Sequence, residues 1–158
     1  MVAEAKMIDG VKIKKLKVVA DERGRLMEIL RNDDEIFQKF GQVYMTTANP
    51  GYVKGWHYHK EQTDNFTCIK GKIKLVLFDS RGDSKTKGEV QEFRISLEDP
   101  VVVQIPPLVF HGFEADSGEE AVVINNVTEP YNREQPDEFR VPFDSPDVPY
   151  KWDSKKGG

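Results

Sequence analysis

The chain has 158 residues, of which 38% are hydrophobic and 32% charged, with a formal net charge of −4 and a pI near 5.5. These values predict one ordered domain over residues 1–158 and argue against a nucleic-acid partner, which would favour a basic surface. The apolar runs are too short to span a membrane, the start is polar where a secretory signal would be apolar, and the single Cys68 cannot form an intramolecular disulfide. A bacterial-type cytosol is therefore the expected location.

The N-terminal part predicts two strands and one short helix. Residues 11–18, "VKIKKLKV", nearly alternate apolar residues with lysines, and a turn at 22–24 precedes a second apolar run at 26–30. The segment "NDDEIFQKFG" opens with capping residues and an acidic turn, has apolar residues on one side and closes at a glycine. It predicts a helix near residues 33–40.

From Gly41 onward the pattern is strand after strand, bounded by turns such as "NPG", "SRGDS" and "SGEE". The predicted strands are "QVYMTTA", "NFTCIKG", "KIKLVLFD", "EVQEFRIS", "VVVQIP", "HGFEA" and "EAVVINNV". In the third of these, Ile73, Leu75 and Leu77 alternate with other residues, so one face should point into the core. Many short strands at this spacing predict an all-β sandwich or barrel.

The last third of the chain is rich in proline, which cannot donate a hydrogen bond within a sheet. We expect this stretch to form an extended strap over the surface that ends at Trp152. Residues 153–158 are expected to form a disordered tail.

Two of the three histidines stand one residue apart in "GWHYHKEQTD", residues 55–64. On a strand, His57 and His59 would point to the same face, and His111 on a later strand could join them with Asp64 at one barrel mouth. A lone histidine is more often structural than functional. Two imidazoles on one face inside a small barrel are costly unless they are used, and the pair therefore predicts a functional site.

The spacing of these residues resembles the cupin superfamily. The first cupin motif is matched by Gly51, His57, His59, Asp64 and Gly71, with Asp64 in the usual Glu position, and the second by Pro106 and His111, with Leu108 in place of a glycine. This resemblance implies a jelly-roll fold.

Four further segments narrow the resemblance, namely "DERGRLMEI" (21–29), "VKGWHYH" (53–59), "IPPLVFHGF" (105–113) and "DSPDVPYKW" (144–152). In this order they resemble the dTDP-4-dehydrorhamnose 3,5-epimerase (RmlC-like) family. The resemblance implies a homodimer without a cofactor, acting on a nucleotide-linked 4-keto-6-deoxy sugar in deoxysugar and surface polysaccharide biosynthesis.

The resemblance also implies roles for individual residues. His57 matches the base that removes a proton next to the ketone, a task suited to neutral imidazole. His111 would orient the site or polarise the keto oxygen, and His59 belongs to the same catalytic set. Arg23 matches the arginine that contacts the nucleotide phosphates, and Glu28 matches an acidic position near the base.

Three substrate-binding positions depart from the family pattern. Lys54 replaces an arginine and keeps its charge but not its bidentate geometry, whereas Asp64 replaces a lysine. Asn125 stands where the family has the tyrosine that returns a proton to the sugar. Tyr131 is the nearest replacement for that tyrosine, and it could equally be a packing residue of the strap.

Three alternatives remain open. The "HxHK" segment also resembles nucleotide-sugar 3,4-ketoisomerases, which use two histidines and no metal. A metal-dependent cupin would hold one divalent metal ion through His57, His59, Asp64 and His111. A sugar-binding cupin that has lost catalysis is the third.

Overall fold

The structure, a computed structural model, describes residues 7–158, and these contain thirteen β-strands and no helix. The strands are β1 (Lys12–Lys15), β2 (Val18–Asp21), β3 (Gly24–Met27), β4 (Gln42–Ala48), β5 (Tyr52–Tyr58), β6 (Asp64–Lys70), β7 (Lys72–Asp79), β8 (Val90–Ser96), β9 (Val101–Ile105), β10 (Val109–Ala115), β11 (Ala121–Val127), β12 (Phe139–Arg140) and β13 (Lys156–Gly157). In this part of the chain nothing helical is long and apolar enough to cross a membrane.

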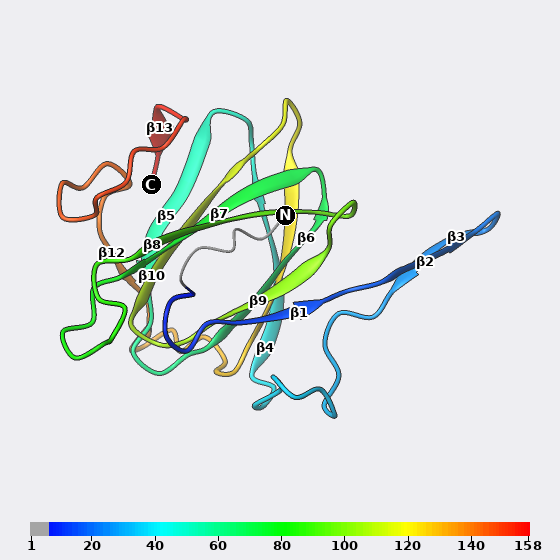
Figure 1. The fold of residues 1–158 in the computed structure, drawn as a ribbon, viewed down its shortest axis with the longest axis horizontal. Coiled ribbons are helices and arrows are strands. Elements are labelled where there is room, and N and C mark those ends of the chain that lie inside the picture. The colour runs from blue at the N-terminus through cyan, green and yellow to red at the C-terminus, as the bar shows by residue number, and fades with distance from the viewer. Residues whose placement is uncertain (1–6) are drawn as a thin grey trace.

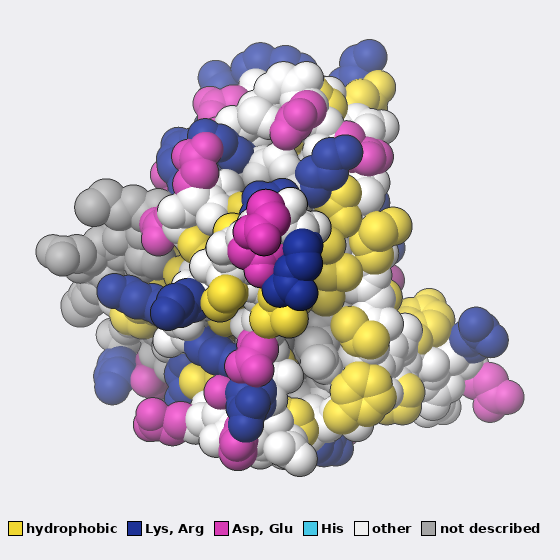
Figure 2. Space-filling model, turned by 90° about the vertical axis from the view of Figure 1, so that its right-hand side faces the viewer, with side chains coloured by type: hydrophobic (Ala, Val, Ile, Leu, Met, Phe, Trp, Pro, Cys, Tyr) yellow, Lys and Arg dark blue, Asp and Glu magenta, His cyan; other side chains and the backbone are white. Residues whose placement is uncertain are grey.

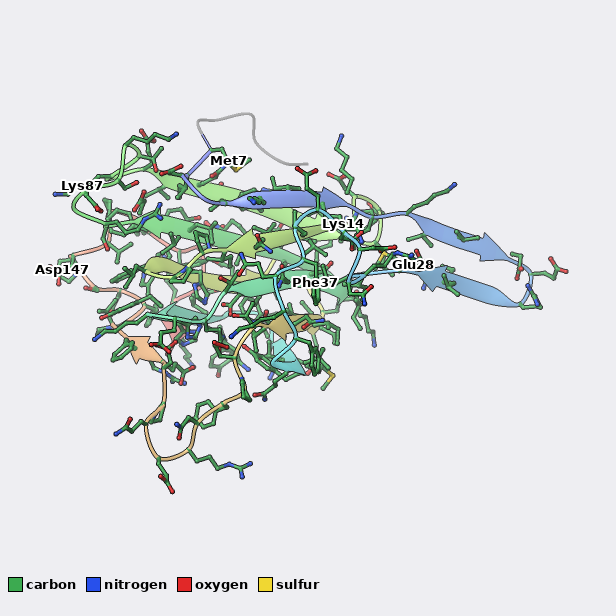
Figure 3. All side chains as sticks on the ribbon, turned by 90° about the horizontal axis from the view of Figure 1, so that it is seen from below. Met7, Lys14, Glu28, Phe37, Lys87 and Asp147 are labelled. Atoms are coloured by element: carbon green, nitrogen blue, oxygen red, sulfur yellow. The ribbon has the colours of Figure 1, made fainter. Side chains whose placement is uncertain are left out.

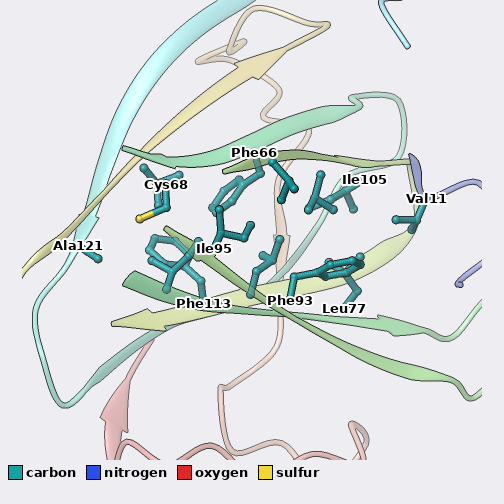
Figure 4. Packing of buried hydrophobic residues seen from close by; sticks show 14 of the residues in the cluster. Val11, Phe66, Cys68, Leu77, Phe93, Ile95, Ile105, Phe113 and Ala121 are labelled. Atoms are coloured by element: carbon teal, nitrogen blue, oxygen red, sulfur yellow. The ribbon is translucent and has the colours of Figure 1, made fainter. Parts of the chain in front are cut away.

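Two sheets face each other as a sandwich (Figure 1). One has the strand order β1-β9-β6-β11-β4, and the other has the order β12-β5-β10-β7-β8, with β13 beside β5. Buried apolar side chains from both sheets, among them Phe66, Leu77, Phe93, Ile105 and Phe113, meet between them (Figure 4). This arrangement confirms the predicted all-β, cupin-type fold.

The outer face of the six-stranded sheet is buried as well. Ile73, Leu75 and Leu77 point into the core as their alternation predicted, while Val76 on the opposite face packs under the C-terminal strap. The strap carries Trp152, which lies 4.9 Å from Trp56 between ring centroids. The proline-rich segment therefore covers this sheet.

The last residues are paired, unlike the disordered tail expected for 153–158. Lys156 and Gly157 form β13 beside β5, and Gly158 N–H donates to the Val53 carbonyl at 3.1 Å. Asp153 reaches the buried ammonium of Lys74 at 2.9 Å. These long-range contacts could not be read from the composition of a short polar tail.

The helix predicted near residues 33–40 is wrong, because the segment forms consecutive turns. The Ile36 carbonyl accepts a hydrogen bond from Gln104 Nε2 of β9 at 2.6 Å, in place of the bond that a helix would form four residues on. The Asp34 carboxylate turns back to the Arg31 N–H at 2.7 Å and to Lys14 Nζ at 2.5 Å. Ile36 is still buried. The apolar residues of this segment therefore indicated burial correctly, although no helix forms.

Strands β2 and β3 form a separate hairpin that projects from the sandwich (Figure 1). Val19 and Leu26 on this hairpin are 56% and 62% exposed. The edge strand β4 also exposes apolar side chains, with Val43 at 51% and Met45 at 62%. Figure 2 looks onto the side from which the hairpin projects and shows hydrophobic side chains exposed there.

Leu108 adopts the left-handed backbone conformation, with φ of 69°, at the turn into β10. Its N–H donates to the His59 carbonyl at 2.7 Å, so the turn ties together the two segments that carry histidines. The cupin pattern has glycine at this position. Glycine adopts positive φ without the steric penalty of a Cβ atom.

We expect Leu108→Gly to be more stable than Leu108→Ala, although both remove the same half-exposed side chain. The left-handed conformation costs a residue with Cβ about 1–2 kcal/mol, and the extra entropy that glycine loses offsets about 0.5–1 kcal/mol. The difference in unfolding free energy should therefore be roughly 1 kcal/mol in favour of glycine, measured by urea denaturation. An alanine variant of equal or greater stability would contradict the strain at this position.

Candidate active site

The three histidines and Asp64 come together at one end of a cavity of about 870 Å³. His57 on β5 and His111 on β10 are directly paired across the two strands, and their ring centroids are 6.2 Å apart. His59 follows just after β5, with its ring 5.3 Å from that of His111. The spacing in the sequence therefore predicted this convergence.

Two glycines let these strands approach. A Cβ atom on Gly55 would lie 2.7 Å from the Gly112 Cα, and one on Gly112 would lie 3.0 Å from the Trp152 ring. The backbone of the neighbouring strand and the C-terminal strap thus occupy the space that a side chain at Gly55 or Gly112 would need. The close contact fixes the position of His57 relative to His111.

Asp64 joins the two sheets beneath the cavity. Its side chain is 1% exposed, and Oδ2 lies 3.0 Å from His111 Nε2 and 3.4 Å from His59 Nε2. Oδ2 has no hydrogen bond of good geometry, so these are mainly charge contacts, while Gln62 donates to Oδ1 at 2.6 Å. Burial alone would raise the pKa of Asp64, but the two histidines outweigh it and lower that pKa well below its usual range.

His59 is held as an imidazolium. Burial alone would lower its pKa, but the contact with Asp64 and its negative charge raise the pKa of His59 to about 9. Its Nδ1 lies 2.6 Å from the Asp137 carbonyl, which can only accept, so this nitrogen carries a hydrogen. In the imidazolium form, Nε2 also carries a hydrogen, and it faces the Asp64 carboxylate.

His57 is in the opposite state. Burial, followed by electrostatic interactions with His111, Arg140 and His59, lowers the pKa of His57 to about 3. Its Nε2 is buried without a hydrogen-bond partner among the residues that the structure describes. His57 therefore stays neutral at physiological pH, and its ring lines the cavity.

The structure brings some of the other predicted residues to the cavity. Lys54, Asn125 and Tyr131 line it, although Tyr131 is 55% exposed. Asn125 is buried and its amide hydrogen-bonds to Tyr44, while Lys54 Nζ donates to Thr46 Oγ1 at 3.1 Å.

Arg23 and Glu28 do not reach the cavity of their own chain. Arg23 sits at the hairpin tip with 86% of its side chain exposed and pairs with Asp21 at 2.7 Å. Glu28 lies at the base of the hairpin (Figure 3) and pairs with Arg31 at 3.5 Å. Neither matches, within one chain, the role that the resemblance implied.

The sequence analysis did not single out Tyr44 and Arg140, which also line the cavity. Arg140 on β12 is paired with His57 across the strands, and no motif marked it. Tyr44 had a visible signal. Along β4 the polar Gln42, Tyr44 and Thr46 alternate with apolar residues, and this polar face is the one that lines the cavity.

A metal ion could bind where His59, Asp64 and His111 meet, since one ligand atom from each lies within 4.8 Å of the others. The Nδ1 atoms of both histidines contact backbone carbonyls, which leaves each Nε2 directed at Asp64, an arrangement common around metal ligands. The donor set therefore fits a divalent cation. His57 is not part of this group.

Comparisons with known proteins agree with this architecture. Residues 19–139 match the family described as "Polysaccharide biosynthesis C-terminal domain". The spore coat polysaccharide biosynthesis protein SpsL of Bacillus subtilis is 38% identical over 149 residues, covering 94% of this chain and 99% of SpsL. The probable low-salt glycan biosynthesis epimerase Agl13 of Haloferax volcanii is 39% identical over 153 residues, covering 96% and 98%.

The dTDP-4-dehydrorhamnose 3,5-epimerase of Methanothermobacter thermautotrophicus is 33% identical over 153 residues, covering 92% of this chain and 80% of that enzyme. The chain belongs to this epimerase family. The crystal structure of a dTDP sugar isomerase from Desulfovibrio desulfuricans G20 superposes with a TM-score of 0.87 at 30% identity, covering 92% of each chain. The family resemblance and the enzyme class, a carbohydrate isomerase, are thereby confirmed.

We expect the imidazoles of His57 and His59 to differ in charge at neutral pH. His57, with a pKa of about 3, should stay neutral between about pH 5 and 8, while His59, with a pKa of about 9, should be protonated at pH 7. Ring ¹⁵N chemical shifts across this range check both, with His57→Asn and His59→Gln for assignment. A His57 midpoint near the ordinary value of about 6.5 would contradict the effect of its surroundings.

Proposed function

We propose that this epimerase acts on a nucleotide-linked, dTDP-type 4-keto-6-deoxy sugar, with His57 as the base. The observation that carries the proposal is the neutral His57 ring, which lines a cavity of about 870 Å³ beside His59 and His111. Such a volume suits a ligand of this size. The expected place of the reaction is deoxysugar and surface polysaccharide biosynthesis in the cytosol.

The chemistry follows from acidity next to a ketone. The neutral imidazole of His57 takes the proton from the carbon beside the carbonyl, and the C–H electron pair becomes the enolate. Proton return to the opposite face inverts that carbon. Epimerisation at this carbon needs no oxidant or reductant, and no metal is required for the proton transfer.

A base with a pKa of about 3 is weak, yet its surroundings compensate. Arg140 and the imidazolium of His59, which both lower the pKa of His57, would also lie near the enolate and stabilise its negative oxygen. Nearby positive charge thus lowers the pKa of the substrate C–H, which donates the proton, together with the pKa of His57, which accepts it. The negative diphosphate of the substrate would act in the opposite direction and raise the pKa of His57.

The substrate phosphates require cations, and Lys54 and Arg140 line the cavity. Arg23 lies too far out on its hairpin to contribute within its own chain. We propose that the protein is a homodimer in which the β2–β3 hairpin reaches the cavity of the partner. The exposed apolar residues of the hairpin and of β4 support an interface between two copies.

A metal-dependent reaction is the second candidate, favoured by the convergence of His59, Asp64 and His111. The imidazolium form of His59 competes with it, because one Nε2 cannot hold both a proton and a metal ion. Metal analysis of protein purified without a histidine tag, with chelation and re-addition of one divalent ion, separates the two candidates. We propose the metal-free reaction.

We expect His57→Asn to lower turnover at least ~100-fold, the typical contribution of a general base. The assay follows dTDP-4-keto-6-deoxyglucose by NMR, which also distinguishes epimerisation from ketone migration and from binding without conversion. Circular dichroism serves as the control for folding. Near-normal turnover in a folded variant would exclude His57 as the base.

We expect Arg23→Ala to raise KM more than it lowers kcat, because a phosphate contact acts in both the ground state and the transition state. If the hairpin serves the partner, mixing Arg23→Ala with His57→Asn subunits recovers activity, since each mixed dimer contains one intact cavity. No recovery after verified subunit exchange would contradict a cavity shared between the two subunits. A monomer in sedimentation would refute the interface itself.

A further inference from the structure

Inversion at a carbon requires a base on one face of the sugar and a proton donor on the other. His57 enters the cavity from β5 of the six-stranded sheet. The donor should therefore come from the five-stranded sheet that faces it. Asn125 of β11 holds the position where the family has a tyrosine, and its amide is not an acid at neutral pH.

We propose that Tyr44, on β4 of the five-stranded sheet, donates the proton that completes the inversion. This inference rests on the proposed function. Tyr44 lines the same cavity as His57 but from the opposing sheet, so the two side chains can flank a sugar ring. β4 lies next to β11, and Asn125 is paired with Tyr44 across these two strands.

Asn125 positions the phenol. Its Oδ1 accepts the Asn65 backbone N–H at 3.1 Å, which fixes the orientation of the amide and directs Nδ2 to the Tyr44 hydroxyl at 2.8 Å. The phenol oxygen therefore accepts a hydrogen bond from Asn125. Among residues 7–158 no side chain or carbonyl accepts the hydrogen of the Tyr44 hydroxyl, so it remains available to the substrate.

The proton balance closes. The enolate carbon takes the phenol hydrogen, a C–H bond forms and the O–H bond breaks, leaving a tyrosinate. The Asn125 amide N–H then hydrogen-bonds to the charged oxygen and stabilises it. Solvent returns a proton to Tyr44 and removes the one held by His57. Burial and the charge of Asp64 raise the pKa of Tyr44, which keeps the phenol protonated before the reaction.

Tyr131 is the competing donor. It lines the cavity, but it is 55% exposed, against 37% for Tyr44, and its backbone N–H donates to Gln42 Oε1 at 2.6 Å. No side chain of residues 7–158 positions its hydroxyl as Asn125 positions that of Tyr44. A variant of Tyr131 is therefore the matched control.

The test measures two events with dTDP-4-keto-6-deoxyglucose in deuterated buffer, namely deuterium uptake and inversion. In Tyr44→Phe, His57 still removes the proton and returns deuterium to the same face. We expect deuterium uptake with retained configuration, while inverted product falls at least ~100-fold. His57→Asn should lose both events, and Tyr131→Phe should keep both.

Inversion by Tyr44→Phe at the wild-type rate, or its loss in Tyr131→Phe instead, would overturn the role of Tyr44 and leave the proposed function standing. A wild-type protein that neither takes up deuterium nor forms product would refute the proposed function and this role together. If Tyr44→Phe lowers the melting temperature strongly, difluorotyrosine at position 44 replaces it. The lower phenol pKa should then move the alkaline limb of the inversion rate to lower pH, and an unmoved limb refutes the proposal.

Discussion

A buried carboxylate between the two sheets determines the electrostatics of the whole site. Asp64 comes from the five-stranded sheet, while His59 and His111 approach it from the side of the six-stranded sheet. An ionised carboxylate in the interior is costly unless opposite charge and hydrogen bonds compensate for it. The compensation here protonates His59, and the added positive charge helps keep His57 neutral. One ion cluster thereby assigns different states to two neighbouring imidazoles.

In the metal-free reaction that we propose, this division of states takes the place of the metal ion of a cupin site. In a metal site the convergent ligands surround a cation, whereas here a proton on His59 supplies positive charge at the same place. His57, the base of the proposed reaction, lies outside this cluster and lines the cavity. The carbonyl contacts of His59 and His111 serve either arrangement, because they fix the rings and direct each Nε2 inward.

The sequence predicted the strands and the meeting of the histidines because both depend on alternation along a strand, a local property. It failed where distant contacts decide the conformation. The Gln104 side chain of β9 donates to the Ile36 carbonyl, which in a helix would accept a backbone N–H. The last residues are held by pairing between β13 and β5. Tyr44 was missed because polar alternation on β4 was read as a strand signal and not as a cavity lining. The resemblance implied that Arg23 contacts the nucleotide phosphates, but in a single chain Arg23 lies exposed at the hairpin tip, away from the cavity.

In the proposed reaction, the weak basicity of His57 and the stabilisation of the enolate would have one origin. Moving cations away from His57 would make it a stronger base but would leave the enolate oxygen less stabilised, so the two effects oppose each other. The positions of these charges relative to His57 are fixed before the substrate binds, because Gly55 and Gly112 allow β5 and β10 to pack in close contact. The diphosphate of the proposed substrate would be the remaining variable charge, and its binding would raise the pKa of His57 only when the sugar is in place. Proton abstraction would then depend on an occupied cavity, and His57 would stay neutral while the cavity is empty.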